Sequence, residues 1–156
     1  MRIAIVTVSD SAAGGQREDR SGPAVAQMCE KLRWQVAATH VVADDLEALG
    51  ALLIELAGTV DLVLTTGGTG IGPRDITPEA TVAVGERMVP GFGERMRTVG
   101  GANFPKAYLA RPTAVVRGST LIVNLPGSPK GAVESLDAVA ELLPHAIEVL
   151  KGARHD

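Results

Sequence analysis

The chain has 156 residues, 46% of them hydrophobic and 21% charged, which is typical of one globular domain, residues 1–156, that needs no disulfide or structural metal. A formal net charge of −3 and an aromatic content of 3% argue against nucleic acid as a partner, because a surface that binds nucleic acid needs basic side chains and aromatic side chains that stack on bases. No apolar run approaches the roughly 20 residues of a membrane span, and the segment before Ser9-Asp10 is too short for a signal peptide. The single Cys29 has no intrachain partner for a disulfide. We therefore expect a cytoplasmic protein without a membrane partner.

The first quarter of the chain predicts two strands with a helix between them. Residues 2–8 are rich in Ile and Val and predict a strand buried on both faces. A polar loop over 9–21 follows, and apolar residues at helical spacing then predict a helix that ends near Arg33. Residues 34–42 predict the second strand.

The next helix is expected to begin at Asp44, which can cap it. Its predicted apolar stripe consists of Leu46, Leu49, Leu53 and Leu56. Residues 60–65 predict a third buried strand, which leads into a loop over 66–76 that is too rich in glycine for regular structure. A helix over 77–87 follows, because Thr77-Pro78-Glu79 has the residues of a helix start.

The second half predicts more helix around a pair of strands. Pro90-Gly91-Phe92-Gly93 is expected to interrupt the chain before a short helix over 94–99. Residues 113–117, taken as an edge strand, and 120–124 predict two strands around a Gly118-Ser119 turn. A long amphipathic helix should begin at Ser128-Pro129, with a kink at Pro144. The alternation predicts a three-layer α/β fold, a mostly parallel sheet with helices on both faces.

Three loops should meet at the carboxyl edge of this sheet, namely 9–21, 66–76 and 125–128. Each precedes a helix whose N-terminal N–H groups suit an anion, and the small residues of 67–70 let a phosphate approach the backbone. The loop lacks the Gly-Lys-Ser/Thr of a P-loop, and Pro73 stands where a dinucleotide fingerprint needs its third glycine. A phosphorylated small molecule is therefore the expected ligand.

Four motifs in order carry a family resemblance. They are Thr65-Thr66-Gly67-Gly68-Thr69-Gly70, Pro73-Arg74-Asp75-Ile76-Thr77-Pro78-Glu79-Ala80, Pro90-Gly91-Phe92-Gly93-Glu94 and Asn124-Leu125-Pro126-Gly127-Ser128-Pro129-Lys130. Together they resemble the MogA/MoaB family of molybdenum-cofactor biosynthesis. The resemblance implies a homotrimer that uses Mg-ATP to adenylylate the terminal phosphate of molybdopterin and releases pyrophosphate. Molybdopterin synthase and the molybdate-insertion enzyme are the protein partners it suggests.

Two aspartates are the candidate catalytic and Mg²⁺-holding residues. Asp75 lies in the glycine-rich loop, where an acid among phosphates is unfavourable unless a cation joins them, although it could instead brace the turn. Asp44 matches the family's catalytic acid, and helix capping is its structural alternative. One aspartate can serve both purposes.

The remaining candidates are pterin- or nucleotide-binding residues. They are Ser9, Asp10, Thr66, Gly67, Gly68, Thr69, Gly70, Arg74, Asn124, Pro126, Gly127, Ser128 and Lys130. Arg74 and Lys130 could contact phosphate or simply pair with exposed acids. Asn124 matches the family's asparagine at the pterin-nucleotide site, although it could satisfy loop backbone, and Ser128 could be a helix cap.

Two departures from the family pattern and the three histidines complete the sequence evidence. The family often has Ser-Asp-Arg after the first strand and Ser-Arg before the late strands, where this chain has Ser9-Asp10-Ser11 and Ala110-Arg111. A guanidinium and a hydroxyl that contact the ligand would then be missing. His40, His145 and His155 have no metal-ligand spacing.

Two other functions stay open beside the adenylyltransferase. One is a MoaB-type protein that binds pterin or nucleotide without turnover, which would be preferable if Asp44 and Asp75 were far apart. The other is a nucleotide pyrophosphatase like the amino-terminal domain of competence-damage-inducible proteins, whose usual loop has a paired Asp-Asp where this chain has Arg74-Asp75.

Overall fold

The computed structural model describes residues 1–154 and contains one six-stranded sheet in the order β2-β1-β3-β6-β5-β4. The strands are β1 (Arg2–Val8), β2 (Gln35–Val42), β3 (Leu62–Thr66), β4 (Arg87–Met88), β5 (Ala114–Arg117) and β6 (Thr120–Leu125). Strands β2, β1, β3 and β6 are parallel, whereas β5 pairs antiparallel with β6 and with β4. The prediction of a mostly parallel sheet is confirmed.

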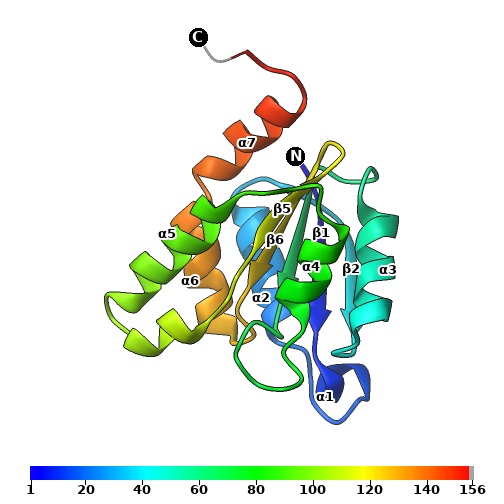
Figure 1. Ribbon diagram of the computed structural model, residues 1–156, viewed down its shortest axis with the longest axis vertical. Helices are drawn as coiled ribbons and strands as arrows, with labels where there is room; N and C mark the ends of the chain where they lie inside the picture. Colours follow the sequence, from blue (N-terminus) through cyan, green and yellow to red (C-terminus); the bar gives the residue numbers. More distant parts are fainter. Residues whose placement is uncertain (155–156) are drawn as a thin grey trace.

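Helices cover both faces of the sheet (Figure 1). They are α1 (Asp10–Ala13), α2 (Ser21–Lys31), α3 (Leu46–Leu56), α4 (Thr77–Val84), α5 (Pro90–Gly101), the 3₁₀ helix η1 (Pro105–Leu109), α6 (Pro129–Val139) and α7 (Leu142–Leu150). One core packs α2, α5, α6 and α7 on the sheet, and a second core packs α3 and α4 on the opposite face. The three predicted layers are therefore present.

The central strands are buried on both faces, which explains their runs of Ile and Val. In β1, Ile3 and Ile5 belong to the core beneath α2, whereas Ala4 and Val6 belong to the core beneath α3. Strand β2 lies at the sheet edge, and its residues alternate between exposed and half-buried. In a parallel sheet between two helical layers, the central strands are apolar on both faces.

Two expectations in the first half need correction. The loop after β1 contains α1, a single helical turn that the Ser9 hydroxyl caps by accepting the Ala12 N–H. Helix α3 is capped by Asp45, whose carboxylate accepts the Ala48 N–H, and not by Asp44. Leu46 is the first residue of this helix and is 48% exposed, so the predicted apolar stripe is buried only from Leu49 onward.

The predicted boundaries in the middle of the chain are also wrong. Helix α4 ends at Val84 because Gly85 is extended and packs on β5, where a Cβ atom would lie 2.5 Å from the Val115 side chain. The following residues form the short edge strand β4, so β5 is not the edge. Pro90 begins helix α5, because a proline at the first helical position gives up no needed N–H group.

The C-terminal helix is broken into two. Helix α6 ends at Val139 and α7 begins at Leu142, so the predicted kink is a full interruption. Pro144 explains it, because proline has no N–H to donate to the carbonyl of Ala140 and its ring collides with that group. Both parts still pack their apolar residues, among them Leu136, Leu143 and Ile147, into one core.

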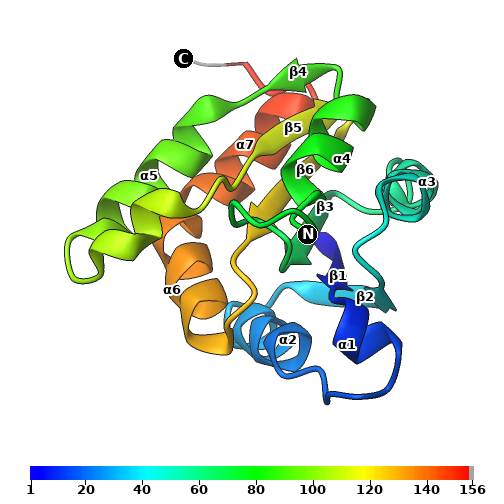
Figure 2. The same ribbon diagram turned by 60° about the horizontal axis from the view of Figure 1, so that its bottom comes forward.

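The topology places one end of the sheet in position for ligand binding. From β1 the chain passes to β2 on one side and then to β3 on the other, so the direction of winding reverses between β1 and β3. Crevices at such a switch point bind ligands in open α/β sheets. Figure 2 turns this end forward and shows α1 and the starts of α2 and α6 around it.

Within residues 1–154, none of the helices combines the length and apolar character needed to cross a bilayer.

Candidate functional site

A cavity of about 350 Å³ opens at the switch point. Its walls come from the loops that follow β1, β2, β3 and β6 and from the segment before α2. Among the residues that line it are Ser9, Arg17, Asp19, Arg20, Ser21, Asp44, Thr66, Gly67, Gly68, Asp75, Gly127 and Ser128. The three loops expected at this edge therefore meet in one cavity.

Two consecutive glycines form one wall of the cavity. Gly67 and Gly68 have φ values of +97° and +67°, in the left-handed region that favours glycine. The Gly67 N–H is already used, since it donates to the Leu125 carbonyl at 3.1 Å. No hydrogen bond in the described part of the chain uses the Gly68 N–H. Of these two amides, only that of Gly68 can donate to a ligand.

Asp44 contacts this wall from the loop after β2. Because Asp45 caps α3, the Asp44 carboxylate is free to turn back, and its Oδ2 accepts the Asp10 N–H at 2.9 Å. A Cβ atom at Gly68 would lie 3.0 Å from Asp44 Oδ1. Burial raises the pKa of Asp44, and the negative charges of Asp10 and Asp75 add to this effect.

Asp75 reaches the same cavity from the loop after β3. Its Oδ2 accepts the Gly72 N–H at 2.8 Å, so this carboxylate does brace the turn. The Asp75 charge acts on the ionisation of Asp44, so the two acids repel each other across the site. Two carboxylates held in mutual repulsion suit a site that receives a cation.

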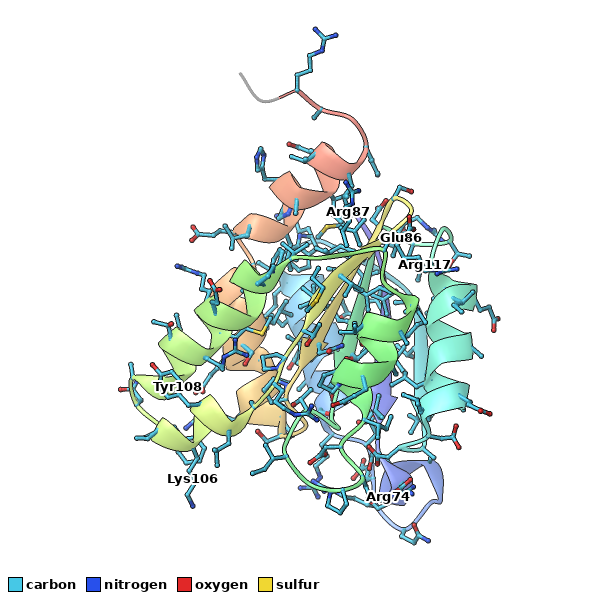
Figure 3. All side chains as sticks on the ribbon, in the orientation of Figure 1. Arg74, Glu86, Arg87, Lys106, Tyr108 and Arg117 are labelled. Carbon is cyan, nitrogen blue, oxygen red and sulfur yellow. The ribbon has the colours of Figure 1, made fainter. Side chains whose placement is uncertain are left out.

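Arg74 connects two of the loops. Its guanidinium donates to both carboxylate oxygens of Asp10, at 2.9 and 3.0 Å, and to the Asp44 carbonyl at 3.2 Å. This pairing with Arg74 and a hydrogen bond from the Asp44 N–H lower the pKa of Asp10. Figure 3 shows Arg74 at the ligand end of the sheet, away from Glu86, Arg87 and Arg117 at the other end. Its guanidinium holds the loops together and does not line the cavity.

Asn124 is completely buried and is not among the residues that line the cavity, so its place at the ligand stays a prediction. Its amide nitrogen donates to the hydroxyls of Thr65 and Thr81, at 3.0 and 2.9 Å. Its oxygen accepts the Thr113 N–H at 3.3 Å. The amide therefore joins β3, β6 and α4 in the interior.

The other predicted binding residues divide into two groups. Ser128 lines the cavity and also caps α6, accepting the Gly131 N–H at 3.0 Å. Lys130 is 87% exposed, lies 3.9 Å from Glu134 and points to solvent, as a surface pair does. The residues that lie outside the cavity lining are Asp10, Thr69, Gly70, Arg74, Asn124, Pro126 and Lys130.

The segment before α2 contributes side chains that sequence reasoning missed. Asp19 accepts the Thr7 hydroxyl at 2.8 Å and the Gly22 N–H at 3.1 Å, which anchors the segment to β1. The Ser21 hydroxyl bonds the hydroxyl of Thr66. Arg17 and Arg20 line the cavity as its cations. Their only sequence signal is membership of a polar loop expected at this edge.

The described residues contain no group of three or more His, Cys, Asp or Glu side chains that could hold a metal ion. His40 and His145 do not line the cavity, and His155 lies outside the described residues. A cation at this site would therefore need ligand oxygens in addition to Asp44 and Asp75. Mg²⁺ is bound in this way, by one or two carboxylates together with phosphate oxygens.

Comparison with known proteins places this cavity in context. The protein-family model described as "probable molybdopterin binding domain" matches residues 4–145 of this chain. The molybdopterin adenylyltransferase of Helicobacter pylori strain J99 is 40% identical, over 97% of this chain and 89% of that protein, and the Escherichia coli K12 enzyme of the same name is 36% identical, over 97% and 86%. The crystal structure of the molybdopterin biosynthesis enzyme MoaB from Thermus thermophilus superposes with a TM-score of 0.91 at 45% identity, over 99% of each chain.

Proposed function

The chain belongs to the family of molybdopterin-binding proteins of the MogA/MoaB type, and from this premise we propose that it is a molybdopterin adenylyltransferase in molybdenum-cofactor biosynthesis. One observation carries the proposal beyond family membership. Asp44 and Asp75, from different loops, line one cavity beside the Gly67-Gly68 wall. A protein that only binds pterin has no need for two opposed carboxylates there.

The proposed reaction transfers AMP from ATP to molybdopterin. An oxygen of the terminal pterin phosphate attacks the α-phosphorus of ATP, the bond from that phosphorus to the bridging oxygen breaks, and pyrophosphate leaves with the bond's electrons. The substrate itself supplies the nucleophile, so the chain needs no nucleophilic side chain. Orientation of the two phosphates and neutralisation of charge are what the protein must provide.

We assign the residues of the cavity to these tasks. Asp44 and Asp75 would hold the Mg²⁺ that accompanies ATP, and this ion would neutralise charge on the phosphate oxygens. The Gly68 N–H and the cations Arg17 and Arg20 would contact phosphate oxygens. The small residues Gly67 and Gly127 keep this wall free of side chains. Ser9, Thr66 and Ser128 would offer hydroxyls to the ligands.

The decisive experiment incubates the protein with molybdopterin, ATP and Mg²⁺ and follows adenylylated pterin by chromatography and mass spectrometry. We expect one pyrophosphate for each adenylylated pterin and no product when EDTA removes the metal. Binding of pterin without any product would contradict the proposal and favour a MoaB-type binding protein. Release of AMP or pyrophosphate without pterin would favour a nucleotide pyrophosphatase.

We also propose that the chain works as a homotrimer, as its family resemblance implies. The described surface carries apolar side chains that an interface could cover, including Phe104, Tyr108 and Leu109 around η1 and Met88 on β4. Sedimentation at micromolar concentration should give the mass of three chains. A monomer throughout that range would contradict the assignment.

A further inference from the structure

Arg111 makes an unusual set of contacts with the loop that carries Asp75. It lies between η1 and β5, on a segment far from this loop in sequence. Its backbone N–H donates to the Thr69 carbonyl at 2.8 Å, its Nε donates to the Gly70 carbonyl at 2.8 Å, and one Nη donates to the Asp75 carbonyl at 2.9 Å. The other Nη pairs with Glu79 on α4, and the Nη that reaches Asp75 also donates to the second Glu79 carboxylate oxygen at 3.4 Å.

These contacts join the two ends of the loop. Thr69 and Gly70 lie where the chain leaves the glycine wall, whereas Asp75 lies just before α4. One planar guanidinium holds the carbonyls of Gly70 and Asp75 at the same time, which a point-like ammonium cannot reproduce. The hydrogen bond within the loop, from the Gly72 N–H to the Asp75 carboxylate, lies between the two carbonyls that Arg111 holds.

Glu79 holds the guanidinium in this orientation. The hydrogen bond and charge of Arg111 lower the pKa of Glu79, so this carboxylate stays ionised at neutral pH. The side chains of Arg111 and Glu79 are 38% and 50% exposed, so the ion pair contributes little to the stability of the fold. Its main effect is to orient the guanidinium. Both nitrogens that reach carbonyls are thereby aimed at the loop.

We propose that Arg111 is a positioning residue for Asp75, which sets where that carboxylate stands in the cavity without touching substrate. The proposal rests on the proposed function for its kinetic consequence, but not for its structural one. Its place in the fold supports the distinction, because Arg111 does not line the main cavity. It lines a second cavity of about 370 Å³, together with Tyr108 and Arg97, and is reachable from solvent there.

The kinetic test compares Arg111→Lys with Arg95→Lys. Arg95 on α5 is a matched control because it also donates Nε to a carbonyl, that of Ala138 at 2.5 Å, and pairs with a glutamate, Glu141, but its partners lie at the end of α6 and just after it. A displaced Asp75 should lower kcat in Arg111→Lys by about a hundredfold with little change in the KM for pterin. The control should keep kcat. An Arg111→Lys protein with the kcat of the control would overturn the proposal.

Two further measurements separate positioning from general loss of structure. Arg111→Ala leaves a space open to the second cavity, and guanidinium at about 20 mM, below denaturing concentrations, should restore part of its kcat while methylammonium should not. A loss that guanidinium does not restore would overturn the proposal.

Hydrogen exchange tests the structural step without any turnover. The amides of 70–76 should exchange at least about tenfold faster in Arg111→Lys than in Arg95→Lys, with exchange in β1 and β3 unchanged. Equal protection of this loop in both variants would overturn the positioning role. If the wild-type protein forms no adenylylated pterin, the proposed function fails, and exchange alone still decides what Arg111 does.

Discussion

Gly67 passes so close to Val8 that a Cβ atom at this position would collide with the Val8 carbonyl oxygen. The contact joins the loop after β3 to the end of β1, the two strands that flank the switch point. Gly67 also contacts Gly127, because a Cβ atom added to Gly127 would lie 3.2 Å from the Gly67 Cα. The three loops of the cavity therefore meet backbone to backbone.

Gly67→Ala should be strongly destabilising, and Gly15→Ala is its matched control. Both glycines have positive φ, +97° and +77°, so both variants carry the left-handed strain of about 1–2 kcal/mol. Gly15 has open space around its Cβ direction, whereas Gly67 adds the collision with Val8. We expect the Tm to fall by about 2–8 °C for Gly15→Ala and by at least about twice as much for Gly67→Ala. Equal melting temperatures would show that the contact with the Val8 carbonyl adds no cost at Gly67.

Asn124→Ala should reduce stability and leave pterin affinity nearly unchanged. The substitution leaves the buried hydroxyls of Thr65 and Thr81 and the Thr113 N–H without their amide partner. We expect a loss of about 2–4 kcal/mol in the free energy of unfolding, measured by urea denaturation. Pterin affinity is measured by fluorescence on the fraction that remains folded. A wild-type urea midpoint together with a loss of pterin affinity would show that Asn124 contacts the ligand.

Much of the fold could be predicted because its central strands are buried on both faces. The Ile, Val and Leu residues of β1, β3 and β6 are strong local signals, and the alternation with helices leaves few topologies. Proline is harder to interpret. Pro129 follows a serine cap and so indicates a helix start, whereas Pro90, followed by glycine, has the same role without a capping side chain.

The candidate site could be predicted where one loop carries it, and less well where contacts join distant segments. Asp44 and Asp45 are both able to cap a helix, and only the path of the chain out of β2 decides that Asp45 does so. The loop position of Arg74 favours phosphate contact, but the loop after β1 brings Asp10 within reach of its guanidinium. Nothing in the sequence around Arg17 or Arg111 indicates which loops they contact.

The pair of Asp61 and Lys151 should make stability depend on acidity. Although desolvation opposes it, hydrogen bonds from Lys151, at 2.8 Å, and from the Arg2 N–H, at 2.7 Å, hold the pKa of Asp61 below its ordinary value of 3.8. A lowered carboxyl pKa stabilises the fold above the ordinary value, and this stabilisation is lost as pH falls through the lowered pKa.

Asp61→Asn should therefore lower the Tm by about 3 °C at neutral pH, corresponding to about 1 kcal/mol, and by progressively less below about pH 4. Glu134→Gln is the control, because Glu134 faces Lys130 at 3.9 Å on an exposed surface and should change the Tm little. Thermal melts of the three proteins between about pH 3 and pH 7 give the comparison. A deficit in Asp61→Asn that stays constant with pH would contradict the assignment.

The last prediction separates the two roles of Asp75, bracing the turn and carrying charge. Its Oδ2 accepts the Gly72 N–H at 2.8 Å, and an asparagine oxygen can accept the same hydrogen bond. Asp75→Asn therefore keeps the turn and removes the charge proposed to hold Mg²⁺, whereas Asp75→Ala removes both. If the metal neutralises charge as pyrophosphate leaves, Asp75→Asn should lower single-turnover adenylylation by about a hundredfold or more, with pterin affinity and Tm close to wild type. Asp75→Ala should show the same loss of turnover and, in addition, a lower Tm, by about 2–4 °C for about 1 kcal/mol of lost bracing. Single-turnover rates, pterin affinity and melting curves on the same samples give the answer. Wild-type turnover in Asp75→Asn would show that the carboxylate only braces the loop.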